Sequence, residues 1–314
     1  MISAKKIPVG ISSCLLGAEV RFDGGHKRHS YITGTLSRYF EFHPLCPEVG
    51  IGLGIPRPPI HLVEQDGRIR CVGAKQPDQD YTDRLRDYAD QLRPLHAALC
   101  GYILKKDSPS CGMERVKVFS NPMPQKKGIG IYAEHLMRNN PLLPVEEEGR
   151  LGDPLLRENF IQRVYVLYRW RALLAEGLSS HKLIEFHARH KLIVMSRGDY
   201  RELGRLLTDL KKENLAEIAD QYILNLMQIL KRIASRGQHV NVLQHIQGYL
   251  KKPLDSDDKA ELCEVIERYR LGAIPLIVPL TLLKHHFRKC PDPYIENSWY
   301  MSPYPPELQL NNQL

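Results

Sequence analysis

The sequence has 314 residues, of which 43% are hydrophobic and 25% are charged, proportions typical of a globular protein long enough for two domains. Seven cysteines are an odd number in a long chain, which argues against a secreted disulfide framework and leaves thiols free for metal binding or catalysis. The net charge of +8 is spread over both halves. This excess favours a long polyanion over a small anionic metabolite as the partner, although a mildly basic soluble protein is an equally ordinary interpretation.

The first half of the chain alternates between strand and helix patterns. The predicted elements are, in chain order, a strand at 7–13, a helix at 30–40, a strand ending at Leu45, a hairpin at 61–73 with its turn at Asp66 and Gly67, a helix at 80–100 kinked at Pro94, a strand at 101–104, an irregular basic stretch at 123–128, a helix at 130–139 and an extended segment at 142–145. Such alternation predicts an α/β domain with a mostly parallel, Rossmann-like sheet.

A polar break at 146–150 separates this half from one with helical periodicity almost throughout. Helices are predicted at 155–175, 180–195, 199–211, 214–235, 238–250, 257–271 and 276–289, followed by an irregular tail from Pro291. We therefore expect two domains, 1–150 and 151–314, the second all-α. No apolar run is long enough to span a bilayer, and the N-terminus enters a strand almost at once, so we expect a cytoplasmic protein without a signal peptide.

Three cysteines lie where predicted strands end. Cys14 follows the first strand, Cys46 follows the second, and Cys111 lies in a Ser-Pro-Ser-Cys-Gly turn after the strand at 101–104. Open α/β sheets bind their ligands at the carboxyl ends of the strands, so these three side chains are expected to meet at one point. Their wide spacing differs from ferredoxin and zinc-ribbon motifs and does not by itself identify a metal. Cys71, Cys100 and Cys263 lie inside regular elements and are expected to be buried apolar thiols.

Two further segments have alternative interpretations. The glycine-broken loop at 20–28 carries Arg21, Lys27 and Arg28 and either binds a phosphate or forms a solvated turn. Near the end of the last long helix, His285, His286 and Cys290 either form a zinc site or are ordinary residues of a helix end.

Four motifs of the first half, taken together and in this order, resemble the thiouracil desulfidase (TudS-like) family over about residues 5–148. They are Ser13–Gly17, Arg21–Gly24, Cys46–Glu48 and Ser108–Gly112. The second half, with Phe186–Lys191 and Gln244–Leu250, resembles an all-helical YbgA-like domain often fused after such a desulfidase. This combination is similar to the bacterial desulfidases that act on 4-thiouridine in tRNA.

The resemblance implies a [4Fe-4S] cluster held by Cys14, Cys46 and Cys111, with one iron not ligated by protein. It places the catalytic glutamate on Glu48 and the catalytic serine on Ser108. Without the cysteines, a surface carboxylate and a loop-capping hydroxyl would be the simpler interpretations of these two residues. Binding of substrate or its phosphate is predicted for a wider set of polar residues around the same motifs, namely Ser13, Arg21, Asp23, Lys27, Arg28 and Ser110.

The predicted function is the hydrolytic removal of sulfur from 4-thiouridine in tRNA, since an open, soft iron suits a thiocarbonyl sulfur. The 180–212 region would contact the RNA backbone through Lys182, Arg189, Lys191, Arg197, Arg201, Arg205, Lys211 and Lys212, although such a run is usually a solvated face. His187 and His190 within it are equally expected as hydrogen-bonded core residues. The alternatives are a desulfidase of free thiouracil or thiolated nucleotides, and a non-enzymatic RNA-binding protein with a structural metal. We expect no obligatory protein partner.

Overall fold

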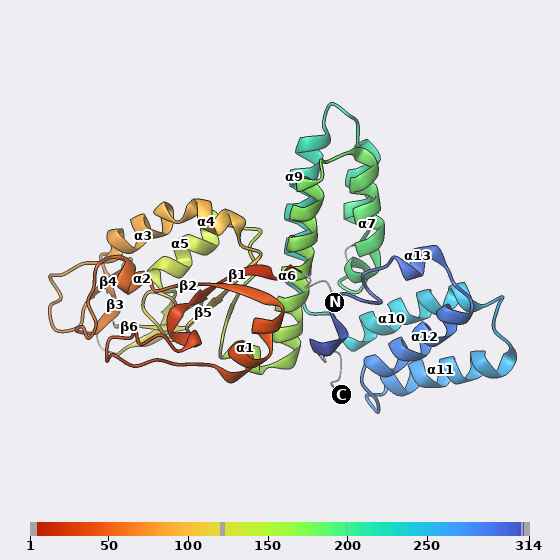
Figure 1. Cartoon of the computed structure of the whole chain (residues 1–314), viewed down its shortest axis with the longest axis horizontal. Helices are drawn as coiled ribbons and strands as arrows, with labels where there is room; N and C mark the ends of the chain where they lie inside the picture. Colours follow the sequence, from red (N-terminus) through yellow and green to blue (C-terminus); the bar gives the residue numbers. More distant parts are fainter. Residues whose placement is uncertain (1–4, 120–122, 199, 309, 311–314) are drawn as a thin grey trace. The chain divides into compact units, whose positions relative to one another are not determined.

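The computed structural model describes residues 5–119, 123–198, 200–308 and 310. It divides into two compact units, Met1–Asp153 and Pro154–Leu314. Figure 1 shows strands and helices in the first unit and helices in the second. The predicted succession of an α/β domain and an all-α domain is confirmed.

A parallel sheet forms the centre of the first unit. Its strands are β1 (Ile7–Ser12), β2 (Phe40–Leu45), β5 (Gly101–Leu104) and β8 (Val145–Glu147), in the order β2-β1-β5-β8. All three strand pairs are parallel. The chain passes from β1 to one neighbour, β2, and later returns to the other side as β5. This reversal of direction creates a switch point beside β1, where ligands of doubly wound sheets bind. The sequence predicted an extended segment at 142–145, whereas the last strand begins at Val145 and ends at Glu147.

The helices of this unit are short. They are α1 (Ser30–Gly34), α2 (Pro47–Gly50), α3 (Thr82–Gln91), α4 (Arg93–Ala98) and α5 (Ile131–Asn139). Of these, α5 is the one that matches its predicted range closely. The single kinked helix expected at 80–100 was wrong, because the helix ends at Leu92 and restarts as α4. Pro94 lacks a backbone donor and its ring crowds the carbonyl four residues earlier, so it occupies the first turn of a new helix. The helix expected at 30–40 likewise ends at Gly34 and continues only as the short turn η2 (Leu36–Arg38).

A second, mixed sheet has the order β4-β3-β6-β7. Strands β3 (Ile60–Gln65) and β4 (Arg68–Gly73) form the predicted hairpin, with Asp66 and Gly67 at positive φ in its turn. Strands β6 (Val116–Phe119) and β7 (Gln125–Gly128) were not predicted. The first is only four residues long, and the second consists of exposed polar residues and a glycine, so neither has a hydrophobic pattern long enough to recognise.

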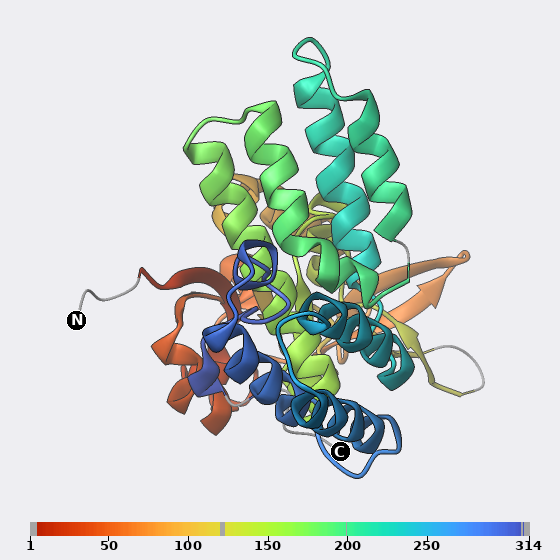
Figure 2. The same cartoon turned by 90° about the vertical axis from the view of Figure 1, so that its right-hand side faces the viewer.

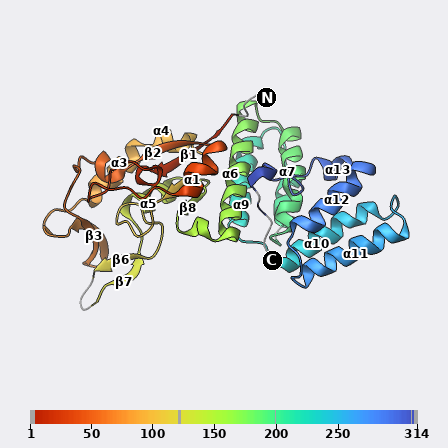
Figure 3. The ribbon, with the colours of Figure 1, turned by 60° about the horizontal axis from the view of Figure 1, so that its bottom comes forward.

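The second unit contains only helices among the residues that the structure describes. The long ones are α6 (Pro154–Ala175), α7 (Ser180–Met195), α9 (Leu215–Leu230), α10 (Arg236–Gln247), α11 (Ser256–Arg270) and α12 (Ile277–Lys289), with α8 (Tyr200–Leu206) and α13 (Pro293–Glu296) shorter. Helices α6, α7 and α8 pack against α9, and α10, α11 and α12 pack against one another (Figures 2 and 3). In the described part of the chain, no helix is long and apolar enough to cross a membrane.

Candidate active site

The three strand-end cysteines line one cleft of about 380 Å³. Cys14 lies in the short turn η1 (Ser13–Leu16) that directly follows β1, and Cys46 lies between β2 and α2. Cys111 lies in the loop after β5. The structure therefore brings together at the switch point three residues that are 32 to 97 positions apart along the chain, counting 46 − 14 and 111 − 14. All three thiols are free, with Cys14 and Cys111 buried and Cys46 half-buried.

The amino end of α5 holds the Cys111 loop. The first N–H groups of an α-helix have no partner within the helix. Here the backbone N–H groups of Ile131 and Ala133 each donate to a carbonyl of that loop, those of Pro109 and Ser110, at 3.1 Å. Gly130 is needed for this approach, because a Cβ there would lie 2.6 Å from the carbonyl carbon and oxygen of Ser110. The loop is thus fixed against a helix end.

Burial makes the isolated thiolates unfavourable. It raises the pKa of Cys14 to about 11, and the neighbouring Cys46 raises it further, while Lys105 and Arg21 oppose the shift. Burial also raises the pKa of Cys46 and, still more, that of Cys111. Thiols whose pKa is raised in this way become thiolates at neutral pH only when a cationic centre compensates for the lost hydration.

The three sulfur atoms are not grouped as tightly as the ligands of a single small ion. A single small ion requires ligand atoms that all lie close together. Among the described residues, the sulfur atoms of Cys14, Cys46 and Cys111 do not all lie within 4.8 Å of one another. In an iron–sulfur cluster each thiolate binds a different iron, so the sulfur atoms are spread by the size of the cluster. The donor set, consisting of thiolates from three separate loops, is also that of such clusters.

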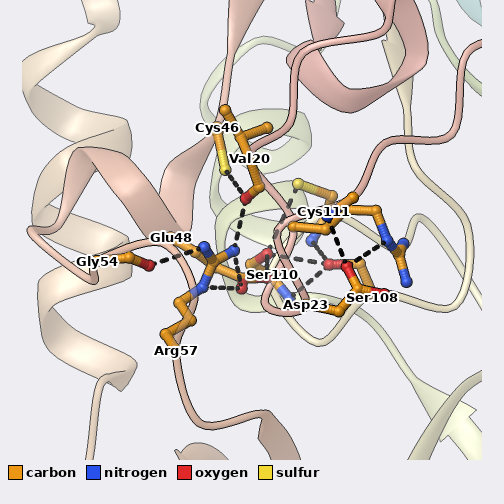
Figure 4. A network of polar contacts seen from close by, with 11 residues as sticks. Val20, Asp23, Cys46, Glu48, Gly54, Arg57, Ser108, Ser110 and Cys111 are labelled. Carbon is orange, nitrogen blue, oxygen red and sulfur yellow. Dashed lines mark hydrogen bonds and ion pairs between the residues drawn. The ribbon is translucent and has the colours of Figure 1, made fainter.

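Glu48 forms a buried ion pair with Arg57 at the edge of this cleft (Figure 4). The Nε and Nη2 atoms of Arg57 lie 3.0 and 2.7 Å from Oε2 of Glu48, and the exposed fractions of the two side chains are 5% and 14%. Arg57 also donates to the carbonyl oxygens of Gly54 and Val20, at 3.1 and 3.0 Å. Two contacts to the backbone thus hold the guanidinium, and two more hold the carboxylate against it, so Glu48 is not the surface carboxylate of the simpler interpretation.

Ser108 caps the cysteine loop and also belongs to a hydrogen-bonded chain in the cleft. Its Oγ accepts hydrogen bonds from the backbone N–H groups of Ser110 and Cys111, at 3.3 and 3.1 Å, and thereby caps the loop. The same oxygen lies 3.0 Å from Oγ of Ser110, which donates to Oε1 of Glu48 at 2.7 Å. A continuous chain of hydrogen bonds therefore joins Ser108, Ser110 and Glu48 along the cleft (Figure 4). Such a chain can carry a proton between its ends.

The remaining predicted residues divide into two groups. Ser13, Arg21 and Lys27 line the cleft together with Ser110. Asp23 and Arg28 are not part of the lining. The carboxylate of Asp23 is half exposed and lies 3.4 Å from Nε of Arg21. The side chain of Arg28 passes Gly17 instead, with its Cδ 3.5 Å from where a Cβ would stand.

The cleft has four further charged lining residues that the sequence did not suggest as site residues. They are Arg57, Lys105, Lys106 and Asp107. The sequence could have indicated Lys105 and Lys106, because they lie just before the Ser108–Gly112 motif. Nζ of Lys105 is held 2.5 Å from Oε1 of Glu148, and the backbone N–H of Lys106 donates to the other carboxylate oxygen at 2.8 Å. With Arg21 and Lys27, the cleft therefore carries cations suited to an anionic substrate group.

In the helical unit, His187 and His190 are core residues. Nδ1 of His187 lies 3.2 Å from the hydroxyl of Tyr222, and burial lowers its pKa to about 4. Nδ1 of His190 lies 2.7 Å from the carbonyl oxygen of Phe186, and burial lowers its pKa to about 3. Arg197 is also buried and donates to Gln162 at 2.8 Å, so its prediction as an exposed backbone contact was wrong. The other cations of this region are exposed or half-buried.

Comparison with known proteins gives matches to two family models and two individual proteins. Residues 9–148 match the model described as 2-thiouracil desulfurase, and residues 191–305 match DUF1722, described as a protein of unknown function. The Escherichia coli (strain K12) protein named "Uncharacterized protein YbgA" is 31% identical over 153 residues, covering 48% of this chain and 90% of YbgA. A solved structure of the [4Fe-4S]-dependent thiouracil desulfidase TudS is 30% identical, covers 48% of this chain and 95% of that chain, and has a TM-score of 0.37.

Proposed function

Because the chain belongs to the family of the Escherichia coli protein YbgA and contains a 2-thiouracil desulfurase domain, we propose that it removes sulfur from 4-thiouridine in tRNA. The resemblance predicted from the motifs of both halves is confirmed, and the N-terminal domain is that of a desulfidase enzyme. The observation that supports the proposed reaction is the composition of the cleft. The cleft combines three free thiols, a fixed carboxylate and a set of cations in one place.

Cys14, Cys46 and Cys111 would hold a [4Fe-4S] cluster, one iron of which has no protein ligand. Bound there, the cluster would supply a soft Lewis acid for the thiocarbonyl sulfur of the substrate. The convergence of the three thiols on one cleft and the burial of Cys14 and Cys111 support this assignment. The reaction is balanced without external electrons, since a thiocarbonyl and one water molecule become a carbonyl and hydrogen sulfide.

Glu48 would act as the general base for that water molecule. Its carboxylate is oriented by Arg57, and its second oxygen is joined to Ser108 through the hydroxyl of Ser110. A water molecule near Ser108 would pass its proton along this chain to Glu48, which returns it to the departing sulfide or to the ring nitrogen. Ser108 and Ser110 would thus lie beside the ring carbon that reacts. Arg57 would be a positioning residue, because it acts through Glu48.

The choice of tRNA as substrate is supported by the distribution of charge. Arg21, Lys27 and Lys106 line the cleft, where they would neutralise a nucleotide phosphate, whereas Lys105 is already paired with Glu148. Exposed cations of the helical domain, among them Arg201, Arg205, Lys211 and Lys212, would contact the RNA backbone. Binding energy from this domain would offset the cost of exposing a stacked base.

The test is anaerobic incubation of the full chain with 4-thiouridine-containing tRNA and, separately, with free thiouracil. We expect uridine to replace 4-thiouridine in the digested tRNA, together with an equal amount of sulfide. Turnover of free thiouracil alone would favour a desulfidase of small thiolated bases. Binding of tRNA without turnover of either substrate, by protein with its cluster intact, would contradict the enzymatic proposal and favour an RNA-binding protein with a structural metal.

A further inference from the structure

Three potential metal ligands of the helical domain lie together at the interface of α11 and α12. They are Asp258 and Glu261 of α11 and His286 of α12. One ligand atom from each residue lies within 4.8 Å of the other two. This group includes neither His285 nor Cys290, so the zinc site considered from the sequence is not the one that the structure assembles.

His286 is the unusual member of this group. Its side chain is 1% exposed, and neither ring nitrogen has a hydrogen-bond partner among the residues that the structure describes. Leaving a buried polar group unsatisfied costs about 1–3 kcal/mol, so such groups in native proteins are usually paired with something. An imidazole in this position, facing two carboxylates, has the arrangement of a metal ligand.

The two carboxylates also lack a compensating charge. Asp258 and Glu261 are three residues apart on one helix and therefore face the same side, where like charges repel. Neither forms an ion pair with a lysine or arginine in the described part of the chain. Asp258 is half-buried and Glu261 is exposed, so the group is reached from solvent. A divalent cation between the three side chains would remove the repulsion and satisfy the imidazole together.

The residue types indicate which cation. Imidazole is a ligand of Zn²⁺, Fe²⁺ and related ions, whereas Ca²⁺ and Mg²⁺ prefer oxygen alone. One histidine with two carboxylates leaves a tetrahedral ion one open position, which water would fill. Zinc bonds of about 2.0–2.2 Å hold neighbouring ligand atoms roughly 3.4 Å apart, so the group needs only a modest contraction to close on the ion.

The position of the group in the fold suggests its effect. Helices α11 and α12 are consecutive and joined by the short connection at 271–276. Asp258 and Glu261 lie in the first two turns of α11, and His286 lies in the last turn of α12, so the group sits at the end of this helix pair remote from the connection. An ion there would link the two free ends of a helical hairpin and stabilise it in the way that a closed loop does.

From these observations we propose that Asp258, Glu261 and His286 form a binding site for a divalent transition metal ion, Zn²⁺ in particular, that stabilises the α11–α12 hairpin. This site is separate from the cysteine cleft and independent of the desulfidase reaction. It is built from oxygen and nitrogen ligands, so its occupant can be distinguished from any metal on the thiols.

The experiment is a titration of the metal-free full-length protein with Co²⁺, a spectroscopic substitute for Zn²⁺, followed by displacement with Zn²⁺. Cobalt on oxygen and nitrogen ligands gives ligand-field bands without the thiolate-to-metal charge-transfer band that cobalt on cysteines produces. We expect one equivalent of the thiolate-free signal in the wild type. Glu261→Gln and Asp258→Asn should each weaken this binding by ~10–100-fold or more, since even changes to groups outside the ligand shell have effects of that size.

Asp257→Asn is the matched control, because it removes the same charge from the same helical turn but lies outside the group of three. It should leave the thiolate-free signal unchanged. Unfolding temperature is the second measurement: Zn²⁺ should raise it in the wild type and in Asp257→Asn, but much less in Glu261→Gln. Both ligand substitutions lie at the surface, so the folded state should persist in them. A thiolate-free signal that is absent from the wild type, or equally strong in Glu261→Gln and Asp258→Asn, would overturn the proposal.

Discussion

The two domains use their buried polar side chains differently. In the N-terminal domain, Glu48, Ser110 and Arg57 are buried or nearly so, yet they border an open cleft at the carboxyl ends of the strands. In the helical domain, His190 and Arg197 are buried and His187 is half-buried, and each is hydrogen-bonded to another residue of that domain. A parallel sheet leaves loops free to converge on a ligand, whereas packed helices absorb polar groups into a core. Chemistry is therefore expected from the first domain and binding from the surface of the second.

Removing one cysteine from each domain is the strongest test of this difference between the domains. Cys46→Ala should abolish both cluster assembly and desulfidase activity, because the cleft offers three thiols and each would be a ligand. The prediction that Cys263 is buried was wrong, because it lies on the exposed surface of α11. Cys263→Ala should therefore leave both unchanged. Iron content, visible absorption and sulfide release measure the difference. Full iron content in Cys46→Ala would remove that residue from the ligand set.

Glu48→Gln should have the next largest effect. The amide keeps the shape of the side chain but cannot accept a proton at neutral pH, so we expect a rate lower by ~10²–10⁴ with the cluster intact. Glu41→Gln, an exposed glutamate of β2, is the control and should turn over normally. Turnover rate and cluster absorption are measured on the same sample. A near-normal rate for Glu48→Gln with its cluster bound would contradict its role as the base.

The sequence predicted the cysteines of the cleft better than it predicted their neighbours, for a physical reason. Cys14, Cys46 and Cys111 follow recognisable strands, and the carboxyl ends of parallel strands must lie at one edge of the sheet. Arg57 comes from a Gly/Pro-rich loop without periodicity, and only its fold around Val20 and Gly54 brings it to Glu48. Strand β7 was missed because its side chains are polar and exposed.

The group in the helical domain shows the same limit. His286 was noticed as part of a sequence-local cluster with His285 and Cys290. The structure brings it together instead with Asp258 and Glu261, which come 28 and 25 residues earlier in the chain, counting 286 − 258 and 286 − 261. Which face of α12 meets which face of α11 is decided by packing of their apolar residues, and no local pattern specifies the polar residues that meet as a result.

Gly130→Ala tests whether the position of the cysteine loop matters for the cluster when all three cysteines are still present. The added methyl group would collide with backbone atoms of Ser110 and with the N atom of Cys111, at 2.6 and 2.8 Å, so the loop must shift. We expect lower cluster occupancy and a loss of stability of ~1–3 kcal/mol, the usual cost of overpacking. Gly34→Ala has no neighbour within 4 Å of its added Cβ and should change neither quantity. Denaturant unfolding and iron content measure both, and an unaffected cluster in Gly130→Ala would show that the loop tolerates displacement.

The smallest expected effect concerns the surface of the helical domain. Lys211 and Lys212 are exposed and belong to the proposed RNA-contacting region. Their double substitution by alanine should reduce the slope of log affinity for tRNA against log salt by about 1–2, because each phosphate contact releases somewhat less than one counterion. Activity on free thiouracil should not change, since neither lysine lines the cleft.

Lys251 and Lys252 provide the matched control for that pair. They are two adjacent exposed lysines of the same domain, so their substitution changes the net charge equally but lies outside the 180–212 region. Filter binding at several salt concentrations would give both slopes. If the two double variants lost equal slope, tRNA would be responding to the net charge of the domain rather than to a defined track. If the slope were unchanged in both double variants, the helical domain would not bind RNA through these lysines. The proposal that the second domain supplies RNA binding would then be contradicted for this surface.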